Sequence, residues 1–271
     1  MSGFENPILK RELKVRIRIA KLIPAIALRC VCLGLIFLLV LLSRLGSGIL
    51  AFVLAEAVLI LLFTPGTVCD AFVSNAGRKD LRDLALTRLR TGATVPGKLV
   101  GANLYTLIIV VLSAPGMFVI STFNRNLIYV NISLLILMFL STAISFAFSI
   151  LFHRNAIAPS IIAYALVFLM ISSVVTTGPL IERVQDAGMR NAIAKSALYI
   201  NPLIMVSRSL GNIDIMRTDY IYTLADPIVG RGFTYPDWRR AGVLYLGISC
   251  LFLFPAFIGF RHRKRYAVSD G

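Results

Sequence analysis

Cysteine and histidine are the residue types of this chain that could bind a metal ion or form a redox pair. Cys30 and Cys32 are separated by one residue, which is not the spacing of a redox C-x-x-C motif. All four cysteines lie in or beside apolar segments, where cysteine usually behaves as a small apolar residue. The two histidines, His153 and His262, lie far apart in the sequence. We therefore expect neither a disulfide bond nor a metal site.

ATP hydrolysis requires a phosphate-binding loop, and the sequence contains no complete G-x-x-x-x-G-K-[S/T] motif. Its nearest approach to this pattern, at 92–98, follows no expected strand. The apolar segments also lack H-x-x-x-H, paired aspartates and G-x-S-x-G. We expect a chain that is not itself an enzyme and that binds no cofactor directly.

Two acidic residues fall in the second apolar segment, where a charge is costly unless it is paired or hydrated. Glu56 lies inside this segment. It is either a polar point on a substrate path, or a protonatable switch, or a neutral carboxyl hydrogen-bonded to a neighbouring Ser, Thr or Tyr. Asp70 lies near the end of the segment, and we expect it to pair with an arginine such as Arg78 or Arg29.

The composition predicts that lipid is the main solvent of the chain. Of its 271 residues, 58% are hydrophobic and 15% are charged, and the mean hydropathy is +0.82. A soluble domain of this size cannot bury so much apolar surface. The formal net charge is +15, but the basic residues form short clusters beside apolar runs. That placement favours membrane lipid over nucleic acid as the charged partner.

Six segments are long and apolar enough to cross a bilayer, which takes about 20 residues in a helix. They are residues 22–42, 49–72, 99–120, 127–152, 157–175 and 241–260. Prolines such as Pro65, Pro115 and Pro255 lie inside these segments, which membrane-spanning helices tolerate. The fold class we predict is therefore an all-α integral membrane protein, forming a single domain over 1–271 with six transmembrane helices.

The positions of Lys and Arg predict the orientation of these helices. Six lie before residue 22, six at 78–98, one at Arg154 and four from Arg261 onward, which gives 17 on one side of the membrane. The short loops on the opposite side carry only Arg44 and Arg125. The positive-inside rule therefore predicts a multi-pass protein of the cell (plasma or inner) membrane with both termini in the cytoplasm.

Two further segments have patterns of their own. Residues 6–21 begin with Asn-Pro, a typical helix start, and place lysine and arginine beside leucine and isoleucine. This pattern predicts an amphipathic helix at the membrane surface, or alternatively a cytoplasmic extension of the first span. Residues 178–240 form a long outer loop between spans five and six. In it we expect short helices on or in the outer membrane surface, with one starting at Asn201-Pro202.

The order of these elements resembles the permease subunits of type-2 ABC exporters, and three short motifs strengthen the likeness. NPILKREL at 6–13 is similar to the family's opening NP-x-x-x-R/K-E-L. DLALT at 83–87, followed by GKL at 97–99, is similar to its D/E-L-L-L-T … G-K-L segment. NPL at 201–203 is similar to the motif that precedes its last span.

This resemblance implies an ATP-driven exporter in which the chain forms the substrate path. A cytoplasmic ABC ATPase would bind ATP and magnesium, and a second permease copy or a paralogue would complete a dimer. The ATPase would dock on the cytoplasmic coupling loop at 75–98 through polar and apolar side chains that suit a groove. These candidate coupling residues are Arg78, Asp80, Leu81, Arg82, Asp83, Leu84, Leu86 and Arg90. Glu56 is the candidate residue on the substrate path.

Two alternatives remain open on the sequence alone. The basic loop at 75–98 could simply hold the topology and contact anionic lipid. The whole chain could also be a membrane scaffold or assembly protein that transports nothing and binds no ATPase.

Overall fold

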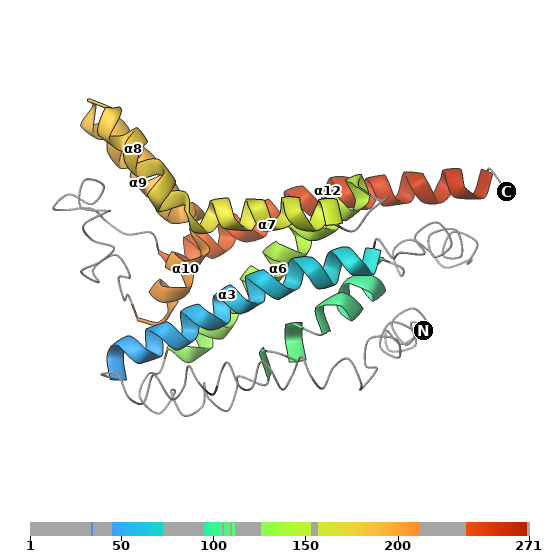
Figure 1. Ribbon diagram of the computed structural model, residues 1–271, viewed down its shortest axis with the longest axis horizontal. Helices are drawn as coiled ribbons and strands as arrows, with labels where there is room; N and C mark the ends of the chain where they lie inside the picture. Colours follow the sequence, from blue (N-terminus) through green and yellow to red (C-terminus); the bar gives the residue numbers. More distant parts are fainter. Residues whose placement is uncertain are drawn as a thin grey trace.

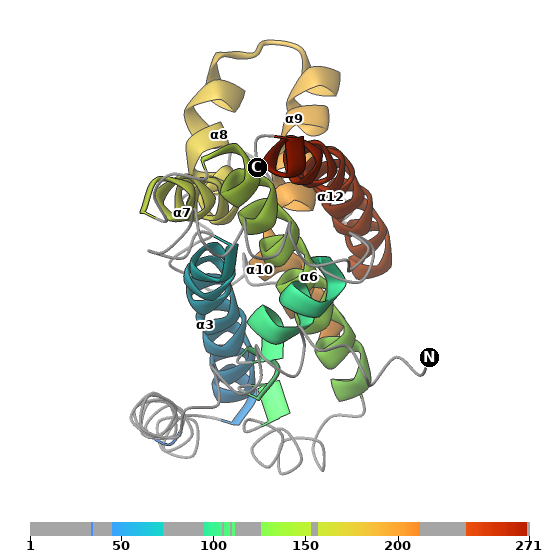
Figure 2. The same ribbon diagram turned by 90° about the vertical axis from the view of Figure 1, so that its right-hand side faces the viewer.

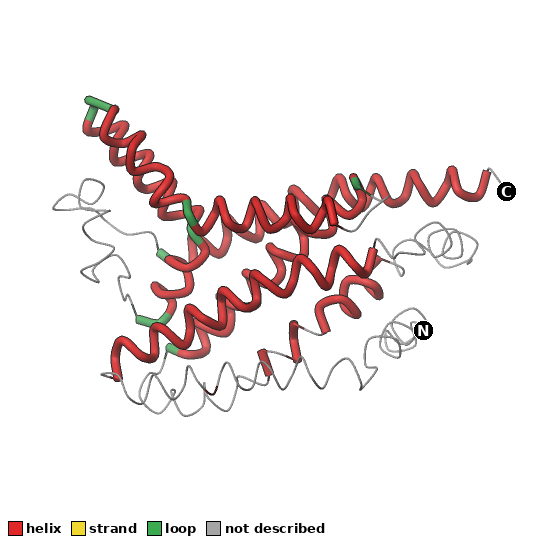
Figure 3. The backbone as a smooth tube through the Cα atoms, in the orientation of Figure 1, coloured by secondary structure: helices red, strands yellow, loops and turns green. Residues whose placement is uncertain are grey.

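The computed structural model describes residue 34 and residues 45–72, 95–104, 106–108, 110–111, 126–152, 157–211 and 237–269. Within these residues the chain is helical apart from short turns, and no strand is present (Figure 3). The helices labelled in Figure 1 are α3 (Leu45–Phe72), α6 (Leu127–Leu151), α7 (Ile157–Ile171), α8 (Ser173–Arg183), α9 (Ala187–Ile200), α10 (Pro202–Ser209) and α12 (Trp238–Ser269). The described residues between 95 and 111 are helical too, and we call them the 95–111 segment.

Three described helices are long and apolar enough to cross a membrane: Ile49–Cys69 within α3, Leu127–Leu151, and Trp238–Arg261 within α12. The pair α7 and α8 is a fourth such span if its two parts count as one. These helices match the predicted second, fourth and sixth segments and the first part of the fifth. The interfacial helix at 6–21, the predicted first segment apart from residue 34, and much of the third segment lie outside the described residues.

The helix α6 lies at the centre of the bundle, packed against α3, α7, α10 and α12 (Figure 2). Its buried face carries small polar residues among leucines, as in Ser141, Thr142 and Ser145. Small side chains let membrane helices approach closely, and each serine hydroxyl can bond within its own helix. Ser145 Oγ donates to the Ser141 carbonyl at 2.6 Å, so the Ser145 hydroxyl is satisfied without lipid or water.

The fifth segment, predicted as one span over 157–175, is divided between two helices in the structure. Its helix breaks at Ser172, and α8 continues at 55° to α7. The helices α8 and α9 then form a hairpin that projects beyond the bundle, and α10 turns back into it (Figure 1). We call this the hairpin end of the bundle. We call the opposite end the loop end. There α3 ends, the 95–111 segment begins, and α12 extends beyond the other helices toward the C-terminus (Figure 1).

Candidate functional site

The coupling residues predicted between Arg78 and Arg90 lie outside the described residues, but the structure describes both places where that loop joins the bundle. The helix α3 ends at Phe72, and helical structure is described again from residue 95. Both points lie at the loop end, so the intervening chain leaves and re-enters the bundle on the same side (Figure 1).

The loop end has its own buried core, which we call the loop-end cluster. Val68 of α3, Val95 and Ala102 of the 95–111 segment, and the ends of α6 and α12 meet in it. The members from α6 and α12 are Phe146, Ala147, Ile150, Ala256 and Phe260. The helices on both sides of the 73–94 connection therefore share one apolar core, through which a force applied to the connection would reach α6 and α12.

Two polar contacts join the 95–111 segment to its neighbours inside this apolar bundle. Thr142 Oγ1 of α6 donates to Asn103 Oδ1 at 2.6 Å, and Asn103 Nδ2 donates to the Leu99 carbonyl at 2.9 Å. The hydroxyls of Thr64 and Thr106 lie 3.4 Å apart, and both side chains are fully buried. Hydrogen bonds of this kind fix the register of helices in lipid, where slippage would expose a polar group to hydrocarbon.

Gly97 and Lys98, which end the stretch closest to a phosphate-binding motif, are helical residues in the structure. Lys98 is buried, with 5% of its side chain exposed. A phosphate-binding loop presents its lysine between a strand and the first turn of a helix. The local structure here is instead a helix packed into the loop-end cluster.

Glu56, the predicted path residue, is fully buried on α3 at the hairpin-end side of Pro65. Its neighbours along the helix, Phe52, Val53, Ala57 and Ile60, belong to the larger buried core of the bundle. We call that core the hairpin-end cluster; it also contains residues of α6, α7, α10 and α12. Glu56 is therefore set among close-packed side chains.

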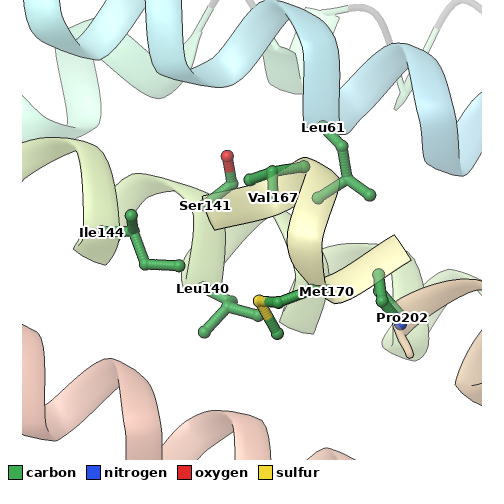
Figure 4. A pocket seen from close by; sticks show the side chains of 7 residues that line it. All are labelled: Leu61, Leu140, Ser141, Ile144, Val167, Met170 and Pro202. Atoms are coloured by element: carbon green, nitrogen blue, oxygen red, sulfur yellow. The ribbon is translucent and has the colours of Figure 1, made fainter. Parts of the chain in front are cut away.

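The one recess that we describe in the bundle lies elsewhere, where α3, α6, α7 and α10 meet (Figure 4). Its lining residues are Leu61, Leu140, Ser141, Ile144, Val167, Met170 and Pro202. The recess is too tight to admit a water molecule. Ser141 Oγ is its one polar side-chain atom and is buried without a hydrogen-bond partner. In this conformation the recess is a packing defect between four helices.

At the hairpin end, the side chain of Asn201 links the end of α7 to the start of α10 through two hydrogen bonds. Its side-chain Nδ2 donates to the carbonyl of Ile171 at 2.6 Å, where α7 ends. Its Oδ1 accepts from the backbone N–H of Leu203 at 3.0 Å and so caps α10. Ser173 Oγ adds a bond to the Ala197 carbonyl at 2.9 Å, which joins α8 to α9. The predicted helix start at Asn201-Pro202 is confirmed.

An aromatic cluster marks the start of α12 at this end. The rings of Tyr129 and Trp238 lie 5.2 Å apart, and the Arg239 guanidinium lies 5.9 Å and 5.8 Å from their centres. Trp, Tyr and Arg are typical of the boundary between lipid and water. The cluster therefore indicates where α6 and α12 leave the hydrocarbon.

The contact between Asn201 and Ile171 could not be found from the sequence, because its partners lie 30 residues apart and no pattern links them. The loop-end cluster has a weak sequence signal in the glycine pair Gly97 and Gly101, whose spacing is typical of closely packed membrane helices. Among the described residues, no group of three His, Cys, Asp or Glu side chains is placed to hold a metal ion. Comparison with protein families, with characterised proteins and with solved structures finds no match to this chain.

Proposed function

We propose that this chain is the permease subunit of an ATP-binding cassette exporter in the cell membrane. It has six transmembrane helices, cytoplasmic termini and a dimeric arrangement with a second permease copy or paralogue. The chain forms the substrate path, and a separate cytoplasmic ATPase supplies the energy. In this orientation the loop end faces the cytoplasm and the hairpin end faces outward.

The observation that carries the proposal is the position of the 73–94 connection. It is the longest link between the helices at the loop end, it contains most of the basic residues of the 78–98 cluster, and the helices at both of its ends share the loop-end cluster. An exporter needs a cytoplasmic element through which an ATPase can move membrane helices. A scaffold needs no such connection between a basic surface and the core of the bundle.

The motifs at 6–13, 83–99 and 201–203, which resemble those of type-2 ABC exporter permeases, support an exporter over other membrane proteins. The third of these motifs caps a helix that packs among α3, α6 and α12. That helix lies beyond the bent pair α7 and α8, in the long segment that the proposal places outside the cell. Residues of that segment are thus close to the helices that would form the substrate path.

Affinity purification tests the proposal. The tagged chain, extracted from its native membrane in mild detergent, is expected to retain an ATPase that contains a Walker motif. Leu84→Asp is expected to abolish that association without reducing membrane insertion, because an added carboxylate opposes docking into an apolar groove. Leu180→Asp is the matched control, since Leu180 lies exposed on α8 at the other end of the bundle. If no ATPase is retained, or if Leu84→Asp retains it fully, the docking proposal fails.

A further inference from the structure

The buried core of the bundle is divided across its length, and α3 and α12 each carry a proline where they pass between the two parts. In α3, Ile60 belongs to the hairpin-end cluster and Val68 to the loop-end cluster, and Pro65 lies between them. In α12, Tyr245 belongs to the hairpin-end cluster and Ala256 to the loop-end cluster, next to Pro255.

The central helix crosses the same boundary differently. In α6 the two clusters meet between Ile144 and Phe146, and the helix contains no proline. Ser145 and Ser149 each donate to the carbonyl four residues earlier at 2.6 Å, so these hydroxyls are satisfied within α6. The bundle thus has a central helix without proline, flanked by two helices that each contain one.

Proline weakens a helix at one defined point, because it lacks an N–H and leaves the carbonyl four residues earlier without its donor. In α3 that carbonyl belongs to Leu61, and in α12 it belongs to Leu251. Sharp bends of membrane helices concentrate at such positions. Both weak points here lie at the boundary between the two clusters.

Side-chain hydroxyls near Pro65 donate to the two carbonyls that flank the Leu61 carbonyl. Tyr164 Oη of α7 donates to the Leu62 carbonyl at 2.8 Å, and Thr64 Oγ1 donates to the Ile60 carbonyl at 2.7 Å. A Cβ atom at Gly66 would lie 3.0 Å from Tyr164 Oη, so the glycine makes room for this contact. Hydroxyl groups of this kind keep backbone carbonyls satisfied in lipid when the regular helical bonds change.

We propose that Pro65 and Pro255 form a transverse hinge about which the loop-end parts of α3 and α12, together with the 95–111 segment, swing against the continuous helix α6. The recess lined by Leu61 and Ser141 shows that packing between α3 and α6 is imperfect close to Pro65. Phe252, which packs against both clusters, is the contact that slides. The inference deepens the proposed function, on which it rests for its purpose: the ATPase would drive this swing through the 73–94 connection.

Distances between spin labels on the full-length chain in lipid nanodiscs, without any ATPase, test the hinge directly. The four native cysteines are replaced by serine. One pair of labels joins Ile128 of α6 to Ile258 of α12, and another joins Ile128 to Val100 of the 95–111 segment. The control pair, Ile128 and Leu151, lies within α6. All four labelled side chains are exposed, so the labels do not disturb the core.

Both hinge-spanning pairs are expected to give broader distance distributions than the control pair. Pro255→Ala is expected to narrow the Ile128–Ile258 distribution to the width of the control, and Pro65→Ala is expected to do the same for Ile128–Val100. Tyr164→Phe, which removes the bond to the Leu62 carbonyl, is expected to broaden Ile128–Val100 and provides a test that needs no proline variant.

Hinge-spanning distributions as narrow as the control, or unchanged in all three variants, would overturn the hinge. This outcome is distinguishable from failure of the proposed function, since the labels report on the isolated chain. If the labels show the hinge but the purified chain retains no ATPase, the motion is established and the exporter assignment is refuted. ATPase binding without a hinge refutes only the present inference.

Discussion

The spans in α6 and α12 are alike in length and hydropathy but differ in how far the bundle buries them. Both pass the length and hydropathy requirements for a membrane span, over 25 and 24 residues respectively. In α6, 67% of the most apolar window is buried inside the bundle, whereas in α12 the share is 22%. Hydropathy therefore identifies helices that can enter lipid, but it does not say which of them the protein itself surrounds.

The residues that distinguish the two helices are polar or small rather than apolar. Along its buried face α6 carries Ser133, Ser141, Thr142, Ser145 and Ser149. In α12, large apolar side chains such as Val243, Leu251 and Phe254 are exposed, and lipid can cover them. A membrane helix at the centre of a bundle needs small residues for close approach, whereas a lipid-facing helix does not.

The largest effect expected from this comparison comes from removing apolar volume. Leu137→Ala in α6 is expected to lower the free energy of unfolding by about 2–5 kcal/mol, because Leu137 is fully buried and its loss leaves a cavity. Leu251→Ala in α12 is expected to change it by less than about 0.5 kcal/mol, because this side chain is 74% exposed. Thermal unfolding in detergent measures both, and equal losses would contradict the assignment of α6 as the central helix.

A smaller effect is expected from adding one methyl group to α12. A Cβ at Gly259 would lie 3.2 Å from Ile150 Cγ2 of α6, so Gly259→Ala is expected to destabilise the bundle by about 1 kcal/mol through overpacking. A Cβ at Gly247 would meet nothing within 4 Å. Gly247→Ala is therefore expected to be neutral or stabilising by up to about 1 kcal/mol, since alanine favours helix. The same thermal assay compares them, and a reversed order would place the contact between α6 and α12 elsewhere.

The smallest effect is expected from a single polar contact. Thr142→Val removes the bond to Asn103 Oδ1 and is expected to cost about 0.6 kcal/mol, a typical value between membrane helices. Thr176→Val is the matched control, because Thr176 is exposed and its hydroxyl donates to carbonyls of Ser172 and Ser173 in its own turn. Indistinguishable melting temperatures for the two variants would mean that the hydrogen bond between Thr142 and Asn103 contributes nothing to the stability of the bundle.

Much of the helical framework could be predicted from the sequence, because apolar length alone determines it. The expected segment at 127–152 corresponds to Leu127–Leu151, and the helix start at Asn201-Pro202 is where a capping residue followed by proline predicts it. The bend at Ser172 could not be predicted, because the side chain that binds the Ile171 carbonyl is Asn201, far along the chain.

The candidate site was less accessible to sequence reasoning than the fold. The burial of Glu56 among apolar side chains depends on how α3 packs, which hydropathy does not reveal. The division of the core into two clusters depends on contacts between α3, the 95–111 segment, α6 and α12, and these segments are separated by long stretches of sequence. The prolines were visible in the sequence, but only the packing places them at a common boundary.

The orientation of the two ends of the bundle is the claim on which the account depends most, and paired cysteine labelling tests it directly. Single cysteines replace Arg82, in the 73–94 connection, and Arg190, which is exposed on α9, in a chain otherwise free of cysteine. A membrane-impermeant maleimide added to intact cells is expected to label position 190 at once and position 82 only after permeabilisation. Labelling of position 82 from outside, with position 190 protected, would contradict the account, because no cytoplasmic ATPase could then reach the connection.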